Sequence, residues 1–153
     1  MTAEVWFYHL EREPLDAVLV KILSGIQARG HRACVHFSAA ETMQALSQRL
    51  WSQEDTGFVP HGSDGDPMPE RQPVWLTTGT ETPNGAAYRF FCEGLMPEEA
   101  GDASRISILF EGSDEAVLAN ARNTWKKFKS EGCGVKYWRQ NESSRWEDQA
   151  AKG

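Results

Sequence analysis

The residues of this sequence best suited to recognising a charged ligand lie between Arg122 and Lys136. Five positive side chains fall in this stretch against one negative residue, Glu131, although the whole chain has a formal charge of −6. The positive residues are Arg122, Lys126, Lys127, Lys129 and Lys136. Trp125 and Phe128 stand between them. Guanidinium and ammonium groups bind carboxylates and phosphates, and aromatic rings offer apolar surface beside them. We therefore expect local recognition of an anionic partner.

A helix over residues 114–131 would sort these side chains by direction, at about 100° per residue. Its core-facing stripe contains Leu118, Ala121, Trp125 and Phe128. Arg122, Lys126 and Lys129 follow one edge of the stripe, and Lys127 lies on the opposite side. An apolar peptide side chain can pack on the indole while the cations bind carboxylates, above all a free C-terminal one. Alternatively, both aromatic rings are core residues and the lysines interact with the helix dipole.

Signatures of catalysis are missing from the sequence. The first expected strand is followed by EREP rather than G-x-G-x-x-G, and neither a phosphate-binding P-loop nor a G-x-S-x-G elbow occurs. We interpret His9 and His36 as structural, hydrogen-bonded residues, and Asp64 and Asp66 as turn formers. TTGTETPNG, residues 77–85, presents backbone N–H groups after a strand but lacks a lysine. We expect no enzyme activity, cofactor or metal.

The composition indicates an ordinary globular domain. The chain has 153 residues, of which 40% are apolar and 25% charged. The sequence contains no run of about 18 apolar residues, so no membrane span is predicted. The N-terminus lacks the lysines of a signal peptide. Cys34, Cys92 and Cys133 form no C-x-x-C pair, so we expect a cytoplasmic protein with reduced thiols. The acidic balance argues against broad contact with duplex DNA.

Alternating strand and helix patterns predict the fold. Strands are expected at 5–10, 32–37, 74–78, 87–94, 105–110 and 135–140, and helices at 15–26, from an N-cap at Ser38 to Trp51, and at 114–131. This order predicts a three-layer α/β domain over residues 1–140, with a mostly parallel sheet and helices on both faces. The strands 74–78 and 87–94 either form an antiparallel hairpin through Asn84-Gly85 or lie apart. Residues 141–153 are expected to be a frayed polar tail.

Four sequence blocks in order resemble one protein family. They are VWFYHLEREPLD, LW-x6-FVPHG, PVWLTTGTETPNGAAYRF and ARNTWKKFKSEG-x4-YW, and the resemblance runs from about residue 4 to Trp146. Together they resemble the chi subunit of bacterial DNA polymerase III, a small accessory protein of the clamp-loader assembly. The resemblance implies a Rossmann-like fold without a nucleotide fingerprint, and a replication adaptor without catalytic activity or cofactor.

The resemblance also implies two binding surfaces. The first binds the acidic C-terminal tail of single-stranded DNA-binding protein (SSB), through Arg122, Trp125, Lys126 and Lys129. Glu111 is expected near the rim of this site. The second joins the psi subunit or another clamp-loader component, through Trp51, Phe58, Val59 and Pro60. An apolar FVP in a polar loop fits burial against a partner or against the chain's own core.

Two other functions compete with the adaptor. One is a nucleotide-dependent enzyme that acts through the TTGTETPNG loop. The other is direct binding of single-stranded DNA by the basic, aromatic helix. The net charge of −6 disfavours the latter, so we expect no direct, specific binding of nucleic acid and no membrane partner.

Overall fold

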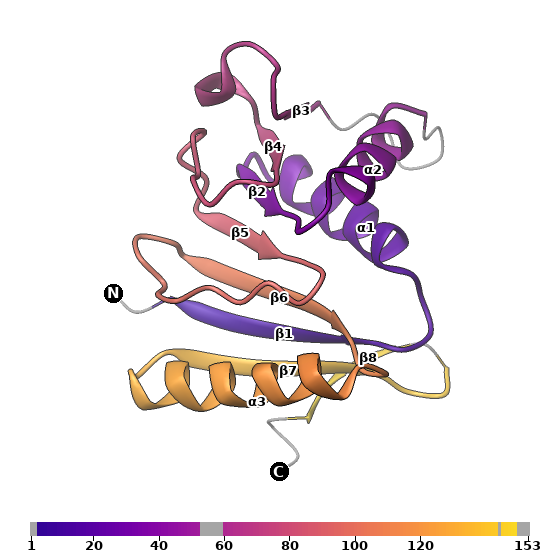
Figure 1. Ribbon diagram of the computed structural model, residues 1–153, viewed down its shortest axis with the longest axis vertical. Coiled ribbons are helices and arrows are strands. Elements are labelled where there is room, and N and C mark those ends of the chain that lie inside the picture. Colours follow the sequence, from indigo (N-terminus) through magenta and orange to yellow (C-terminus); the bar gives the residue numbers. More distant parts are fainter. Residues whose placement is uncertain (1–2, 53–59, 144, 150–153) are drawn as a thin grey trace.

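An open, mostly parallel sheet of eight strands forms the centre of the part of the chain that the computed structural model describes, residues 3–52, 60–143 and 145–149 (Figure 1). The strands are β1 Glu4–Leu10, β2 Ala33–His36, β3 Gly62–Ser63, β4 Val74–Thr77, β5 Tyr88–Phe91, β6 Arg105–Glu111, β7 Gly134–Gln140 and β8 Trp146–Asp148. Their order across the sheet is β3-β4-β2-β5-β6-β1-β7-β8, and only the β7–β8 pair is antiparallel. The helices are α1 Leu15–Ala28, α2 Ala40–Ser52 and α3 Glu115–Ser130, with a short 3₁₀ turn at Pro69–Arg71.

Two hydrophobic cores lie on opposite faces of the sheet, so the predicted three-layer α/β fold is confirmed. In β1, Val5 and Phe7 pack in the core beneath α3, whereas Tyr8 and Leu10 pack in the larger core beneath α1 and α2. This alternation follows from the two-residue period of a strand. Because both faces carry cores, the central strands are buried almost throughout.

Two of the helical crossovers start from neighbouring strands and run in opposite directions across the sheet. Helix α1 leads from β1 to β2, and α3 leads from β6 to β7 on the other face. The carboxyl ends of β1 and β6 therefore flank a topological switch point, where open α/β sheets tend to bind ligands.

The question of a hairpin after β4 is settled by the pairing of β2. Both β4 and β5 pair with β2 in parallel, so they lie apart. Asn84 ties the intervening loop to the sheet, because its Nδ2 donates to the carbonyls of Ala33 and Gln72, each at 3.0 Å. Its Oδ1 accepts from the backbone N–H of Ala86.

The ends of α3 agree with the prediction from the sequence, whereas the start of α2 does not. Asp114 caps α3 by accepting from the N–H groups of Ala116 and Val117. Gly132, with φ +86°, follows the last turn. The predicted N-cap at Ser38 is wrong: α2 begins at Ala40, and the carboxylate of Glu93 accepts from the N–H groups of Ser38 and Ala39.

The segment after residue 140 joins the sheet, and the expectation that it frays is wrong for Trp146–Asp148. These residues form β8 and pair with β7, which is therefore not an edge strand. The ring of Trp146 meets the ring of Tyr8 edge to face, with centres 5.5 Å apart. None of the helices in the described ranges combines the length and apolar character required to cross a bilayer.

Candidate functional site

The exposed edge of α3 carries the cations that the sequence placed there. Arg122, Lys126 and Lys129 are exposed, and Lys127 is exposed on the other side of the helix. No acidic side chain among the described residues forms an ion pair with any of these four. An exposed cation without a partner of its own chain is free to bind a ligand carboxylate.

Trp125 lies beside this edge and is only partly buried. Its ring contacts the rings of Phe7 and Tyr137, with centres 5.7 Å and 6.1 Å away. The Nζ of Lys129 lies 6.0 Å from the indole centre. Phe128, by contrast, is completely buried. The indole is therefore held firmly on its inner side while part of it meets solvent beside a cation.

Tyr137 is a neighbour of the site that the helix pattern did not identify. It comes from β7, and its hydroxyl bonds to Nδ1 of His9 at 2.7 Å. Burial raises the pKa of Tyr137, and the positive charges of Arg139 and Arg122 oppose that rise. Tyr137 thus supports the Trp125 ring from β7.

His9 is held in one tautomer by its two partners. Its Nε2 lies 3.1 Å from the Glu11 carboxylate, which can only accept, so Nε2 carries the proton and Nδ1 accepts from Tyr137. Glu11 also pairs with Arg139. A Cβ at Gly112 would lie 1.7 Å from His9 Nε2, so glycine is required for this close approach. The predicted structural role of His9 agrees with these bonds.

Two buried histidines should make the protein less stable in mild acid. Burial lowers the pKa of His9, with a further contribution from Arg139, and burial lowers the pKa of His36. The unfolded chain therefore binds more protons than the native state once the pH falls through the ordinary histidine value of 6.5. The free energy of unfolding should drop by on the order of 1–3 kcal/mol from about pH 7.5 to about pH 5.5.

Urea unfolding at the two pH values measures this drop. His9→Gln keeps a hydrogen-bonding group beside Tyr137 but does not titrate, so the variant should lose roughly half of the pH dependence. Equal pH dependence in the variant and the parent would exclude His9 as a source.

A second surface lies at the end of α2. Trp51 is 57% exposed, and its ring centre lies 4.7 Å from that of His61, which is buried. Ser47 Oγ bonds to His61 Nε2 at 2.9 Å. Pro60 is partly buried beside them. Two residues of the predicted partner interface, Trp51 and Pro60, lie on this surface. The other two, Phe58 and Val59, lie outside the described residues.

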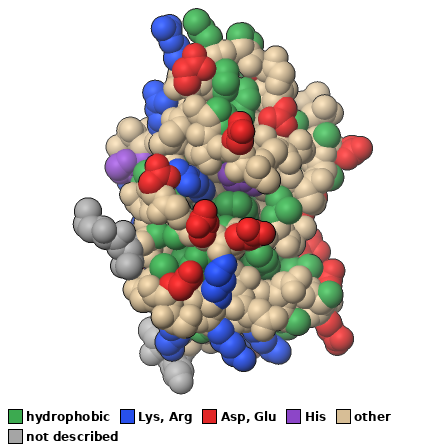
Figure 2. Space-filling model, turned by 60° about the vertical axis from the view of Figure 1, so that its left-hand side comes forward, with side chains coloured by type: hydrophobic (Ala, Val, Ile, Leu, Met, Phe, Trp, Pro, Cys, Tyr) green, Lys and Arg blue, Asp and Glu red, His purple; other side chains and the backbone are tan. Residues whose placement is uncertain are grey.

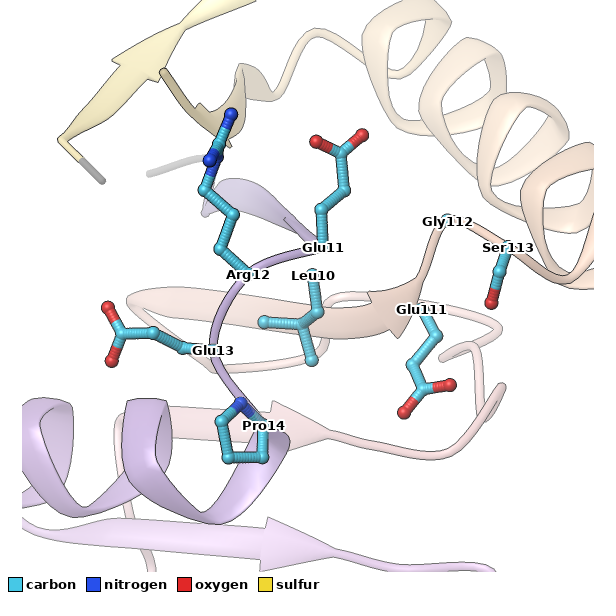
Figure 3. A pocket seen from close by; sticks show the side chains of 8 residues that line it. All are labelled: Leu10, Glu11, Arg12, Glu13, Pro14, Glu111, Gly112 and Ser113. Carbon is cyan, nitrogen blue, oxygen red and sulfur yellow. The ribbon is translucent and has the colours of Figure 1, made fainter. Parts of the chain in front are cut away.

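The switch point between β1 and β6 holds a pocket of about 480 Å³ (Figure 3). Its lining comes from two loops, residues 10–14 and 111–113, and includes the carboxylates of Glu11, Glu13 and Glu111. Arg12 is the one cation of the lining. This charge disfavours a phosphate at the position where nucleotide-binding sheets hold one. Glu111, expected near the α3 site, lies in this pocket instead, and it also lines a neighbouring pocket with Asp114, the N-cap of α3.

The TTGTETPNG loop is also unsuited to an anion. The N–H of Thr78 donates to the Asp64 carboxylate at 2.8 Å, and the N–H of Gly79 donates to Thr77 Oγ1 at 2.9 Å. Asp66 accepts from the N–H of Ser63, as a turn former does. Asp64 is not a turn former; its carboxylate holds the TTGTETPNG loop through the N–H of Thr78. Within the described ranges, no three His, Cys, Asp or Glu side chains are grouped to hold a metal ion.

Comparison with known proteins agrees with the sequence resemblance. The family model described as "DNA polymerase III chi subunit, HolC" matches residues 1–136. A relative named "Probable DNA polymerase III subunit chi", from Rickettsia prowazekii (strain Madrid E), is 25% identical over 80 residues, which are 52% of this chain and 48% of that protein. The matched part spans about half the length of the relative. Since the family model covers most of the chain, including all of β1 and α3, the protein belongs to the DNA polymerase III chi subunit family.

Proposed function

We propose that this protein is a non-catalytic replication adaptor, which acts in the cytoplasm and binds the acidic C-terminal tail of SSB on the exposed edge of α3. Membership of a family of polymerase III subunits supports a replication role. The observation that carries the proposal is a set of exposed cations, paired with no acidic side chain in the described ranges, beside a partly open indole on α3. Through Trp51 and Pro60, with Phe58 and Val59, the adaptor would join psi or another clamp-loader component.

The chemistry of an acidic tail with an apolar last residue fits the α3 edge. Arg122 presents a planar fork that suits a terminal carboxylate, whereas Lys126 and Lys129 suit the acidic side chains before it. The open part of the Trp125 indole offers apolar surface to the last side chain. Charge pairing at a surface is screened over about 10 Å at ordinary ionic strength, so the affinity should fall with added salt.

Replacing Arg122 with alanine should weaken binding of the SSB tail peptide by about 1–3 kcal/mol, because a charge-assisted hydrogen bond to the terminal carboxylate is lost. This change corresponds to roughly a 5- to 150-fold increase in Kd. Calorimetric titration of the variant with a peptide of the tail sequence measures it.

Lys127→Ala is the matched control, since Lys127 is equally exposed on the same helix but on its other side. It should bind the peptide nearly as the parent does. Amidation of the peptide's C-terminus removes the carboxylate and should reproduce the effect of Arg122→Ala. Equal binding by the parent, Arg122→Ala and the amidated peptide would overturn the assignment.

A further inference from the structure

On the face of the sheet opposite α3, the first halves of β1, β6 and β7 are only partly covered. Helices α1 and α2 pack mainly over β2, β3 and β4 on this face. Tyr8 and Leu10 in β1 are buried beneath α1, whereas Trp6, nearer the start of the strand, is partly exposed. Arg105 from β6 and Lys136 from β7 lie beside the Trp6 ring and are also partly exposed. We call the surface formed by Trp6, Arg105, Lys136, Trp138 and Trp146 the tryptophan face.

A pocket of about 310 Å³ opens at the tryptophan face, between α1 and the strands β1, β7 and β8. Most of its lining is apolar and consists of Trp6, Tyr8, Trp138, Trp146, Val18 and Ile22. The ring centres of Trp6 and Trp138 are 5.5 Å apart, as are those of Tyr8 and Trp146. The charged residues of the lining, Lys21 and Glu13, pair with each other at 2.8 Å. The pocket therefore suits one bulky apolar side chain, which gains by leaving water for aromatic surface.

Two cations lie against rings of this face. The guanidinium carbon of Arg105 lies 3.7 Å from the Trp6 ring centre and 5.1 Å from that of Tyr88. The Nζ of Lys136 lies 5.0 Å from the Trp6 ring centre and 5.6 Å from that of Trp138. These distances allow cation–π attraction, which extends to about 6 Å. Within the described ranges neither cation pairs with a carboxylate. Because a ring attracts a cation without neutralising it, both charges are left for an anionic group.

The carboxylates around the tryptophan face are mostly bonded to other groups. Glu13 accepts from Lys21 at 2.8 Å and from Gln140 at 2.7 Å. Asp148 accepts from a backbone N–H of β7 at 2.9 Å, and Glu4 is exposed at the start of β1. Figure 2 shows Lys and Arg side chains gathered at the lower end of the molecule, where α3 and β7 lie in Figure 1. An acidic segment that approaches this end therefore meets positive charge, although the whole chain has a formal charge of −6.

We propose that the tryptophan face binds an acidic peptide segment of a partner protein, with one bulky apolar side chain in the pocket and carboxylates against Lys136 and Arg105. Tryptophan and arginine are among the side chains that most often dominate protein interfaces. Single-stranded nucleic acid fits less well, because its bases stack on open ring faces and Arg105 already lies over the Trp6 ring. The face is separate from the α3 edge, since Trp6 and Trp138 pack with the core beneath α1, whereas Trp125 packs with the core beneath α3.

Nuclear magnetic resonance of the indole N–H groups tests the proposal on the intact protein. The probe is a short peptide with a leucine between pairs of aspartates, blocked at both ends so that it lacks the terminal carboxylate expected at the α3 edge. The signals of Trp6, Trp138 and Trp146 should shift in a saturable manner, and that of Trp125 should not. Replacing the leucine with serine should weaken binding about tenfold, because the apolar contact in the pocket is lost.

Three outcomes of this titration would overturn the proposal. The first is the absence of any shift, and the second is a shift confined to Trp125, which would mean binding at the α3 edge. The third is binding of oligothymidylate at the tryptophan face as tightly as the peptide, because the face would then recognise nucleic acid.

Charge variants on the two faces of the sheet separate this site from the α3 edge. Lys136→Gln removes a cation but keeps a long polar side chain, so the blocked peptide should bind at least about threefold more weakly. Lys127→Gln is the matched control, because this lysine is exposed on α3, and it should bind the peptide as the parent does. Arg122→Ala, which tests tail binding, should also leave the blocked peptide unaffected. Equal affinity of Lys136→Gln and the parent, or equal losses in Lys136→Gln and Lys127→Gln, would contradict the proposal.

Discussion

Replacing Trp51 with alanine is expected to weaken the proposed complex with psi or another clamp-loader subunit by about 2–4 kcal/mol, or roughly 30- to 1,000-fold in Kd. Tryptophan is the side chain most often found to dominate an interface, because its large ring loses much solvent contact when a partner covers it. Trp51 is 57% exposed although it is strongly apolar, and its ring is positioned against His61. Titration of the variant with each purified clamp-loader subunit measures the loss.

The matched control for Trp51 is Gln44→Ala, an exposed substitution two turns earlier on α2. It should leave the affinity within about 0.5 kcal/mol of the parent, as most surface substitutions do. Thermal unfolding of Trp51→Ala separates a loss of fold from a loss of contact. A folded Trp51→Ala protein that binds every subunit as the parent does would remove this residue from the interface.

Strong local patterns were sufficient to predict most of the fold. Helix α1 shows its apolar period clearly, and the central strands show short apolar runs, so their positions were predicted correctly. To predict which strands pair in the sheet, contacts between residues distant in sequence would have to be known. The parallel arrangement of β4 and β5 around β2 depends partly on the bonds of Asn84 to Ala33 and Gln72, which no local pattern reveals.

The errors have the same physical origin. Ser38 is a good N-cap by type, yet Glu93 from the end of β5 accepts the N–H groups at the start of α2. Trp146 stands in a polar segment, but its ring packs against Tyr8 and the larger core, and the N–H of Tyr137 donates to the Asp148 carboxylate. In both cases a tertiary contact supplies what the local sequence lacks.

The candidate site on α3 was predictable because a single helix carries it. Helical spacing alone places Arg122, Lys126 and Lys129 on one edge, and the structure shows that edge exposed. The same spacing does not reveal Tyr137, which comes from β7 and contacts the Trp125 ring. Sites assembled from several elements are therefore found only when the fold is known.

The two proposed binding surfaces are well placed for an adaptor. Trp51 is on α2, which packs on the core of one sheet face, whereas the cationic edge belongs to α3 on the opposite face. Partners bound on opposite faces need not collide, and distant sites without shared contacts usually behave additively. We therefore expect Trp51→Ala to leave tail binding unchanged and Arg122→Ala to leave clamp-loader binding unchanged.

Phe128→Ala should lower the free energy of unfolding by about 3–5 kcal/mol, the usual cost of removing a buried phenylalanine ring from a core. Phe128 is fully buried in the core beneath α3, together with Val5 and Phe7, and this core is the smaller of the two main clusters. Native domains are stable by only about 5–15 kcal/mol, so the loss is a large share of the total. Urea unfolding measures it, with Lys127→Ala on the same helix expected to change stability by less than about 0.5 kcal/mol.

The same variant distinguishes the packing that fixes α3 from the cations on its edge that would bind the tail. The Trp125 ring is held by Phe7 and Tyr137, so Phe128→Ala protein that is still folded at low temperature should retain tail binding. Arg122→Ala should show the reverse, with stability nearly unchanged and tail affinity reduced. A loss of less than about 1 kcal/mol in Phe128→Ala would mean that α3 is not fixed by this core. The cations on its edge would then lack the rigid support that selective recognition of a carboxylate requires.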